Sequence, residues 1–245
     1  MIAHTDAAGT AGGRGAPAEP AVRITGLTKG FGGQPVFTDF DLTVPRGERL
    51  AILGASGCGK STLLRCIAGL EAPQAGTIAV AGEVGFVFQE PRLFPWLTVE
   101  KNVDFAARDA VERSRIGEVL ALVGLTAART KLPKELSGGM AQRATLARTL
   151  VRKPDLILLD EPLAALDALR RLELRAALRE IVAASDATAI LVTHDVDEAI
   201  DLGTRYLVFE RAEGGVRASE PAAHNAGAPE TLRKRLLAAL GVKSA

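Results

Sequence analysis

The nine residues from Gly54 to Thr62 constrain this chain more than any other stretch, because they match the phosphate-binding pattern G-x-x-x-x-G-K-[ST]. The apolar run at 49–53 predicts a buried strand before them, and residues 61–70 predict a helix after them. A strand, a glycine-rich loop and a helix in this order fold backbone N–H groups and a positive helix end around phosphate oxygens. We therefore predict a phosphate loop made of Gly54, Ala55, Ser56, Gly57, Cys58, Gly59, Lys60, Ser61 and Thr62.

Two side chains of this loop have chemical tasks in the pattern. Lys60 is expected to reach the β and γ phosphates of a nucleoside triphosphate, and Ser61 to offer its hydroxyl to Mg²⁺. Thr62 is expected to contact a more terminal phosphate oxygen or to cap the helix. The alternative is an ordinary glycine-rich turn that opens a helix and carries a Lys-Ser pair by chance. The pattern does not name a reaction, because kinases, GTPases, helicases and transport ATPases share it.

Composition narrows the class of protein. The 245 residues are 47% hydrophobic, which is enough for a sizeable core. The 30 basic and 29 acidic residues nearly balance, which argues against a nucleic-acid partner. Two cysteines are too few for a disulfide scaffold, and reduced thiols indicate a cytosolic protein. No apolar run approaches the ~20 residues that span a bilayer, so any connection to a membrane is expected to come through a partner.

The chain divides into three parts by its patterns. Residues 1–20 are rich in Ala, Gly and Pro and are expected to be disordered. Residues 21–212 carry the strand and helix patterns of an α/β core, with a helical subdomain inserted at about 93–150. The last predicted strand of this core is at 206–209. Residues 213–245 are expected to be a tail with a helix at 229–240.

The N-terminal part of the core predicts a small antiparallel β layer. A strand is expected at 22–27, and the alternation of Phe40, Leu42 and Val44 with polar residues predicts a half-buried strand. Phe31 lies in the glycine-rich stretch 29–33, predicted as a loop, where it either stacks on a nucleobase or anchors the loop. Residues 76–85 are rich in Gly and Ala and predict a hairpin or a loop.

Polar side chains are expected at the carboxyl ends of three core strands, where ligands bind in α/β sheets. Gln89 follows a strand at 84–88, and His194 follows a strand at 189–192. Asp160 and Glu161 follow the apolar run 156–159. Asp160 is a candidate Mg²⁺ ligand, and Glu161 is a candidate to polarise an attacking water. The alternatives are a loop glutamine, a structural histidine and a helix cap after a strand.

The block 98–150 is predicted to be mostly helical, with Gly124 as a helix stop. Within it Ser137 is a good N-cap, and Gly138 and Gly139 leave the first-turn N–H groups uncovered, so that this helix start predicts a second anion site. Before the block, the stretch 91–97 is apolar and holds the only tryptophan, which predicts a partner-binding patch or an aromatic packed on its own core.

With these residues in view, the chain resembles the ATP-binding subunit of an ABC transporter, from about residue 22 to residue 209. Phe31 is similar to the family's base-stacking aromatic, although tyrosine is commoner there. Residues 54–62 match the Walker A, Gln89 matches the Q-loop and residues 136–142 match the signature. Asp160 matches the Walker B acid, and Glu161 matches the catalytic carboxylate. Residues 165–167 match the D-loop, with Ala165 where serine is usual, and His194 matches the switch histidine. The signature separates this family from other phosphate-loop proteins.

The resemblance implies a phosphate-loop α/β fold and an ATPase that uses ATP and Mg²⁺. It implies catalytic roles for Lys60, Gln89, Glu161 and His194, and Mg²⁺ contacts for Ser61, Gln89 and Asp160. It also implies a head-to-tail homodimer in which the 137–139 helix start of one chain completes the ATP site of the other. The implied partners are membrane permease subunits and a substrate-binding protein, with the chain peripheral on the cytoplasmic face.

A narrower resemblance concerns the solute. The stretches 88–96 and 163–169 are similar to those of the nitrate, sulfonate and taurine importer group, which implies import of a small anion; polyamine and thiamine importer ATPases are also similar here. Two other classes stay open at this point. One is a soluble ABC ATPase that is not coupled to transport, although such chains usually carry a coiled coil, zinc cysteines or a second ATPase domain. The other is a pure nucleotide-binding module.

Overall fold

The strand β3 (Arg49–Gly54) lies inside the larger of two sheets, with a parallel neighbour on each side. A computed structural model describes residues 19–164, 168–220 and 229–242. In these residues, β3 directs Leu50 and Ile52 into one apolar core and Ala51 and Leu53 into another. A strand buried on both faces reads as a continuous apolar run, which is the pattern seen at 50–53.

The larger sheet has six strands in the order β5-β6-β7-β3-β8-β9. The strands β5 (Val84–Val87), β6 (Leu156–Asp160), β7 (Thr188–Thr193), β3 and β8 (Arg205–Ala212) pair in parallel, and β9 (Gly215–Ser219) returns antiparallel to β8. Parallel strands place their carboxyl ends at one edge of the sheet, where ligands bind in such folds. The ends of β3, β6 and β7 therefore share one edge.

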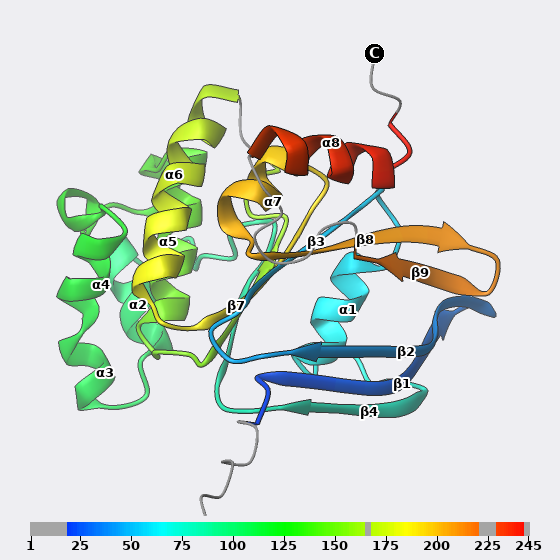
Figure 1. The fold of residues 1–245 in the computed structure, drawn as a ribbon. Helices are drawn as coiled ribbons and strands as arrows, with labels where there is room; N and C mark the ends of the chain where they lie inside the picture. Colours follow the sequence, from blue (N-terminus) through cyan, green and yellow to red (C-terminus); the bar gives the residue numbers. More distant parts are fainter. Residues whose placement is uncertain (1–18, 165–167, 221–228, 243–245) are drawn as a thin grey trace, which may run out of the picture.

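The smaller sheet is antiparallel and has the order β2-β1-β4. It consists of β1 (Val22–Phe31), β2 (Gln34–Val44) and β4 (Ala75–Val80), and in Figure 1 it lies below α1 (Lys60–Ile67). The predicted alternation holds, because Phe40, Leu42 and Val44 are all buried. The expected α/β fold with an antiparallel N-terminal layer is confirmed.

The helical block lies to one side of the larger sheet (Figure 1). It contains no strand within 98–150. Its helices are α2 (Val99–Ala106), α3 (Ala110–Ser114), α4 (Ile116–Leu122) and α5 (Gly138–Leu150), with short 3₁₀ turns at Thr126–Ala128 and Pro133–Glu135. Beyond it, α6 (Ala168–Ala184), α7 (Val196–Leu202) and α8 (Pro229–Ala239) cover the sheet, and Leu236 of α8 is fully buried. The helix expected at 229–240 is thus present.

Three local predictions were wrong. Residues 76–85 are not a loop, because β4 occupies 75–80 and pairs with β1. Phe31 is not in a loop but ends β1, and the turn to β2 is formed by Gly32 and Gly33 at φ 56° and 79°. A strand at 215–219 was not expected, so the larger sheet extends past residue 212. For 75–80, pairing with the distant strand β1 overrides a weak local signal, whereas Phe31 and the strand at 215–219 pair with the next strand of a hairpin.

Some expectations fall outside the described residues. These are the disorder of residues 1–18 and the match of residues 165–167 to the D-loop. The division of the chain into domains stays a prediction. Among the described residues, no helix is both long and apolar enough to cross a membrane.

Candidate functional site

The phosphate loop closes over the carboxyl end of β3. Gly54 has φ 157°, and a Cβ there would lie 2.6 Å from the Phe209 carbonyl oxygen, so that a side chain is excluded. Gly59 has φ 101° and is the N-cap of α1. A Cβ on Gly59 would lie 2.6 Å from Val36. The two glycines let the loop turn tightly against its neighbours, which exposes backbone N–H groups at the start of a helix.

A chain of charged groups crosses the site. The Lys60 ammonium is buried and donates hydrogen bonds to the carbonyls of Gly54 and Ala55 at 2.7 and 3.0 Å. Its Nζ also lies 3.6 Å from Glu161 Oε1. The other carboxylate oxygen of Glu161 lies 3.2 Å from His194 Nδ1. Glu161 is therefore held between a cation of the loop and an imidazole from the end of β7.

The second acid of the site contacts the loop directly. Ser61 Oγ donates a hydrogen bond of 2.6 Å to Asp160 Oδ1. Asp160 is the last residue of β6 and is nearly buried. Burial raises the pKa of Asp160, and the hydrogen bond from Ser61 lowers it in part. A hydroxyl and a carboxylate at this distance form the kind of oxygen pair that Mg²⁺ prefers.

Glu161 carries backbone strain at the site. Its φ is 44°, in the left-handed region that a residue with a side chain adopts at a cost of about 1–3 kcal/mol. Its N–H donates to the Val192 carbonyl of β7 at 3.0 Å, which fixes the turn after β6. The strained turn directs the carboxylate toward Lys60 and His194.

A buried carboxylate supports the segment that carries His194. The side chain of Glu198 in α7 accepts a hydrogen bond from the Thr193 hydroxyl, and that hydroxyl accepts one from the Asp195 N–H at 3.0 Å. Glu198 is only 3% exposed, and burial raises its pKa to about 7. Sequence patterns did not indicate this residue, although it lies four residues after His194, in the first turn of α7.

Two predicted residues lie apart from this cluster. Gln89 is exposed two residues beyond the end of β5, and within the described chain it makes no hydrogen bond to Ser61 or Asp160. Phe31 is 51% exposed, and Lys29 Nζ lies 4.9 Å from the centroid of its ring. The structure thus gathers the loop, Asp160, Glu161 and His194 but not the other candidates.

The second predicted anion site is a separate helix start. Ser137 caps α5 by accepting a hydrogen bond from the Met140 N–H at 3.3 Å. A cavity of about 230 Å³ lies there, and its lining among the described residues comes from α5, its cap and α6: Ser137, Gly139, Arg143, Glu173, Leu174 and Ala177. No residue of the phosphate loop lines this cavity. Gln142 of the same helix donates to the Phe88 carbonyl at 3.3 Å, which ties α5 to the segment before Gln89.

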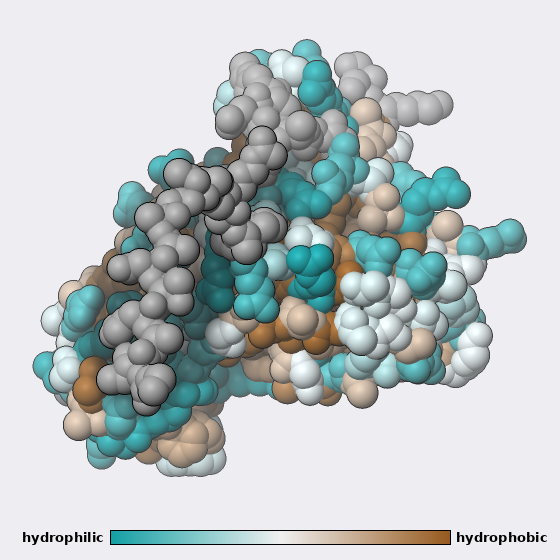
Figure 2. Space-filling model, turned by 60° about the horizontal axis from the view of Figure 1, so that its bottom comes forward, coloured by the Kyte–Doolittle hydropathy of each residue, from teal (hydrophilic) through white to brown (hydrophobic). Residues whose placement is uncertain are grey.

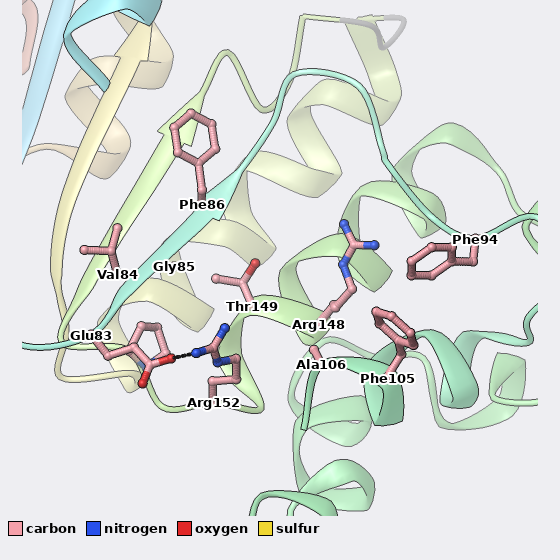
Figure 3. A pocket seen from close by; sticks show the side chains of 11 residues that line it. Glu83, Val84, Gly85, Phe86, Phe94, Phe105, Ala106, Arg148, Thr149 and Arg152 are labelled. Atoms are coloured by element: carbon pink, nitrogen blue, oxygen red, sulfur yellow. Dashed lines mark ion pairs between the residues drawn. The ribbon is translucent and has the colours of Figure 1, made fainter. Parts of the chain in front are cut away.

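A larger cavity of about 380 Å³ lies between β5 and the helical block. Figure 3 shows Phe94 and Phe105 on one side of it, Arg148 of α5 between, and the ion pair of Glu83 with Arg152 on the other. The ring centroids of Phe94 and Phe105 are 4.5 Å apart. The cavity thus combines an aromatic wall with guanidinium groups.

One buried amide fixes the aromatic loop at 94–98. Asn102 is fully buried; its Nδ2 donates to the carbonyls of Phe94, Leu97 and Thr98, and its Oδ1 accepts from the Phe94 N–H at 2.8 Å. The loop nevertheless leaves Trp96 71% exposed. On the face of the whole molecule that Figure 2 shows, apolar residues gather near the middle and hydrophilic residues border them. An ordered loop that exposes a tryptophan is typical of a surface that meets a partner.

The comparisons with known proteins agree with this geometry. The family model described as "ABC transporter" matches residues 37–164. An aliphatic sulfonates import ATP-binding protein, SsuB 3 of Paraburkholderia xenovorans, is 46% identical over 93% of this chain and 91% of its own length. SsuB 2 of Streptomyces avermitilis is 47% identical over 91% and 92%. Among solved structures, cbiO1 of Clostridium perfringens, part of an ABC transporter complex, aligns with a TM-score of 0.73 and 28% identity over 83% of this chain and 89% of that one.

Proposed function

The chain belongs to the ABC transporter family and is an ABC-type ATPase subunit, and we propose that it drives the import of an organic sulfonate or a similar small anion. The observation that carries the ATPase chemistry is the carboxylate of Glu161 held between Lys60 and His194. The solute follows from the relatives above, which are named for sulfonate import and match this chain over nearly its whole length.

We assign binding of the triphosphate to the phosphate loop. Its N–H groups and the start of α1 receive the phosphate oxygens, and Lys60 neutralises charge on the β and γ phosphates. The hydroxyl of Ser61 and the carboxylate of Asp160, 2.6 Å apart, form an oxygen donor set that fits Mg²⁺. Mg²⁺, when bound, would neutralise charge on the transferring phosphoryl group. One carboxylate and one hydroxyl suffice there, because Mg²⁺ in such sites keeps water and phosphate ligands.

Glu161 is our candidate for the residue that orients and polarises the attacking water. The ammonium of Lys60 and the imidazole of His194 hold its two oxygens, so that the carboxylate is fixed before the nucleotide arrives. His194 and Lys60 then stabilise charge that develops on the γ phosphate. We propose that Gln89 reaches the ATP site only when the exposed segment that carries it moves.

We propose that the ATP site is completed by a second copy of this chain. The helix start at Ser137 offers uncovered N–H groups, yet in the part of the chain that the structure describes its cavity is lined by its own helix, its cap and α6 alone. A head-to-tail dimer places that helix start against the γ phosphate bound by the other chain. Closure of the dimer then depends on the triphosphate, and its hydrolysis releases the closed state.

The cavity between β5 and the helical block is our candidate for the permease-docking site, on the cytoplasmic face of a membrane (Figure 3). Its aromatic wall and its guanidinium groups suit an amphipathic helix of a membrane protein. The exposed Trp96 lies beside it, 5.6 Å from Phe94 between ring centroids. This surface favours a transport subunit over an ABC ATPase that acts alone.

A reconstituted complex tests both parts of the proposal. The chain is purified with the permease that co-purifies with it and placed in proteoliposomes with the cognate binding protein. Ethanesulfonate is expected to stimulate phosphate release, and a Glu161→Gln chain is expected to release none. Stimulation by neither ethanesulfonate nor another small anion such as nitrate would contradict the solute alone, and wild-type release in Glu161→Gln would contradict the catalytic assignment.

The docking surface has its own variant in the same system. We expect Trp96→Ala to weaken co-purification with the permease, because it removes the exposed aromatic, while phosphate release by the isolated chain continues. Val111→Ala, which truncates another exposed apolar residue away from the cavity, serves as the control. Equal recovery of the permease with both variants would rule out the docking role of Trp96.

A further inference from the structure

Two β-hairpins of the chain meet beside the phosphate loop. One hairpin is β1–β2, and the other is β8–β9, with Arg211 paired to Val216. The Thr38 hydroxyl of β2 donates a hydrogen bond of 2.6 Å to the Gly214 carbonyl in the turn of the second hairpin. Figure 1 shows the free ends of both hairpins side by side. The second hairpin is therefore fixed against the first.

A cavity of about 180 Å³ opens where the hairpins face each other. Its lining consists of Phe31, Gln34, Pro35 and Val36 from one hairpin, Arg211, Gly215 and Val216 from the other, and Gly57 and Cys58 of the phosphate loop. The volume is below the about 300–1,000 Å³ of pockets that hold whole drug-sized ligands. It therefore suits one part of a nucleotide whose phosphates bind the adjoining loop.

Both hairpins pack directly on that loop. A Cβ placed on Gly59 would lie 2.6 Å from Val36 and 3.3 Å from Val216. The residues that wall the cavity are thus positioned by the same contacts that shape the phosphate loop. A group that extends from a bound triphosphate reaches the cavity without crossing the protein.

The rim of the cavity presents hydrogen-bond donors. Arg211 Nη2 donates to Gln34 Oε1 at 3.1 Å. That bond uses the acceptor of the Gln34 amide and leaves its NH₂ group and the remaining guanidinium N–H groups to donate. Lys29 lies over one face of the Phe31 ring, and the Phe31 side chain is 51% exposed and lines the cavity, so that the ring is accessible for stacking. Purine bases offer a flat π face together with ring-nitrogen acceptors at their edges.

We propose that the β8–β9 hairpin forms the second wall of a nucleobase pocket, in which Arg211, oriented by Gln34, donates hydrogen bonds to a purine and Val216 packs against it. This inference rests on the proposed binding of ATP and adds a specificity-determining residue to it. The base is then held between the stacking face of Phe31 and the second hairpin. Affinity for a nucleotide consequently exceeds affinity for its phosphates alone.

Titration calorimetry with ATP and with inorganic tripolyphosphate, both with Mg²⁺, tests the pocket. For Arg211→Ala we expect the Kd of ATP to rise about tenfold and the Kd of tripolyphosphate to stay at the wild-type value. Gln34→Ala should raise the Kd of ATP by a smaller factor. Arg217→Ala is the matched control, because Arg217 is an exposed arginine of β9 that does not line the cavity; it should change neither Kd.

Each other outcome overturns a definite statement. An unchanged Kd of ATP in Arg211→Ala would refute the pocket and leave the proposed ATPase untouched. Equal weakening of ATP and tripolyphosphate would also refute it, since Arg211 would then act on phosphates. A wild-type chain that binds neither ligand would refute the proposed function itself, and the base pocket with it.

Discussion

Replacing the buried Glu198 by glutamine is expected to change how the stability of this protein depends on pH. The carboxylate is 3% exposed, and the wild-type pKa is raised to about 7 from an ordinary 4.5, chiefly because burial penalises the charged form. The Thr193 hydroxyl and Arg171 lower that pKa, and the neighbouring carboxylates of Asp195 and Glu161 raise it further. A glutamine keeps an oxygen for the Thr193 hydroxyl and has no charge to bury.

The size of the effect follows from proton linkage. A pKa that is higher in the folded state means that this carboxyl favours folding below pH 4.5 and that the advantage is lost as pH rises through about 7. At 1.36 kcal/mol per unit of pKa, the wild-type free energy of unfolding should fall by about 2–3 kcal/mol relative to Glu198→Gln between pH 5 and pH 8. For a chain of this length that corresponds to roughly 5–10 °C in Tm.

Urea unfolding and thermal melting of both proteins at pH 5, 6, 7 and 8 measure this difference. Groups that titrate alike in both proteins cancel in the difference between the two free energies of unfolding. Glu180→Gln, which alters an exposed glutamate of α6, is the control and should give a difference that is flat with pH. If the difference between wild type and Glu198→Gln is equally flat, or if the variant loses stability relative to wild type toward pH 8, the reasoning from burial is wrong.

The remaining predictions concern the site and the aromatic loop. The Lys60→Ala chain should bind ATP more weakly and stay monomeric on gel filtration. The Glu161→Gln chain should bind ATP, release no phosphate and form an ATP-dependent dimer. A Glu161→Gln chain that stays monomeric with ATP would argue against closure of the dimer on the triphosphate. Adding Ser137→Arg to Glu161→Gln should abolish that dimer, because a bulky cation fills the second anion site; persistence of the dimer would exclude this helix start from the interface. Asn102→Ala should destabilise the fold by about 2–3 kcal/mol, since the partly buried carbonyls of Leu97 and Thr98 lose their donor. The same change should shift the fluorescence of Trp96, the only tryptophan; an unaltered spectrum would mean that Asn102 does not order the loop.

The charged centre of the site was predictable because its signals are local. Lys60 and Ser61 belong to one contiguous pattern, and Asp160, Glu161 and His194 each follow an apolar strand of a parallel sheet. Such strands end at a common edge, so that their positions in sequence predict their meeting in space. The structure brings these residues within hydrogen-bonding or ion-pair distance of one another.

What the sequence did not reveal depends on how strands and hairpins pair with one another. The strand β4 is rich in Gly and Ala and becomes a strand because β1 pairs with it. In the strand β9 apolar and polar residues alternate over too few positions to predict a strand. Gly214 and Gly215 after β8 were nevertheless a turn signal that could have indicated a hairpin. The pairing of Gln34 with Arg211 joins the two hairpins across most of the chain. No local pattern predicts that contact.

The central place of β3 has a consequence for how the chain is made. Its parallel partners begin at Thr188 and Arg205, so the strand that leads into the phosphate loop leaves the ribosome long before either neighbour exists. Until then both of its backbone edges are unpaired, and its apolar side chains have no second layer to cover them. Long-range parallel pairing is slow and exposes such segments to aggregation. Nascent chains that stop short of β7 should therefore collect in inclusion bodies or on chaperones, and the nucleotide site should appear only when synthesis is nearly finished.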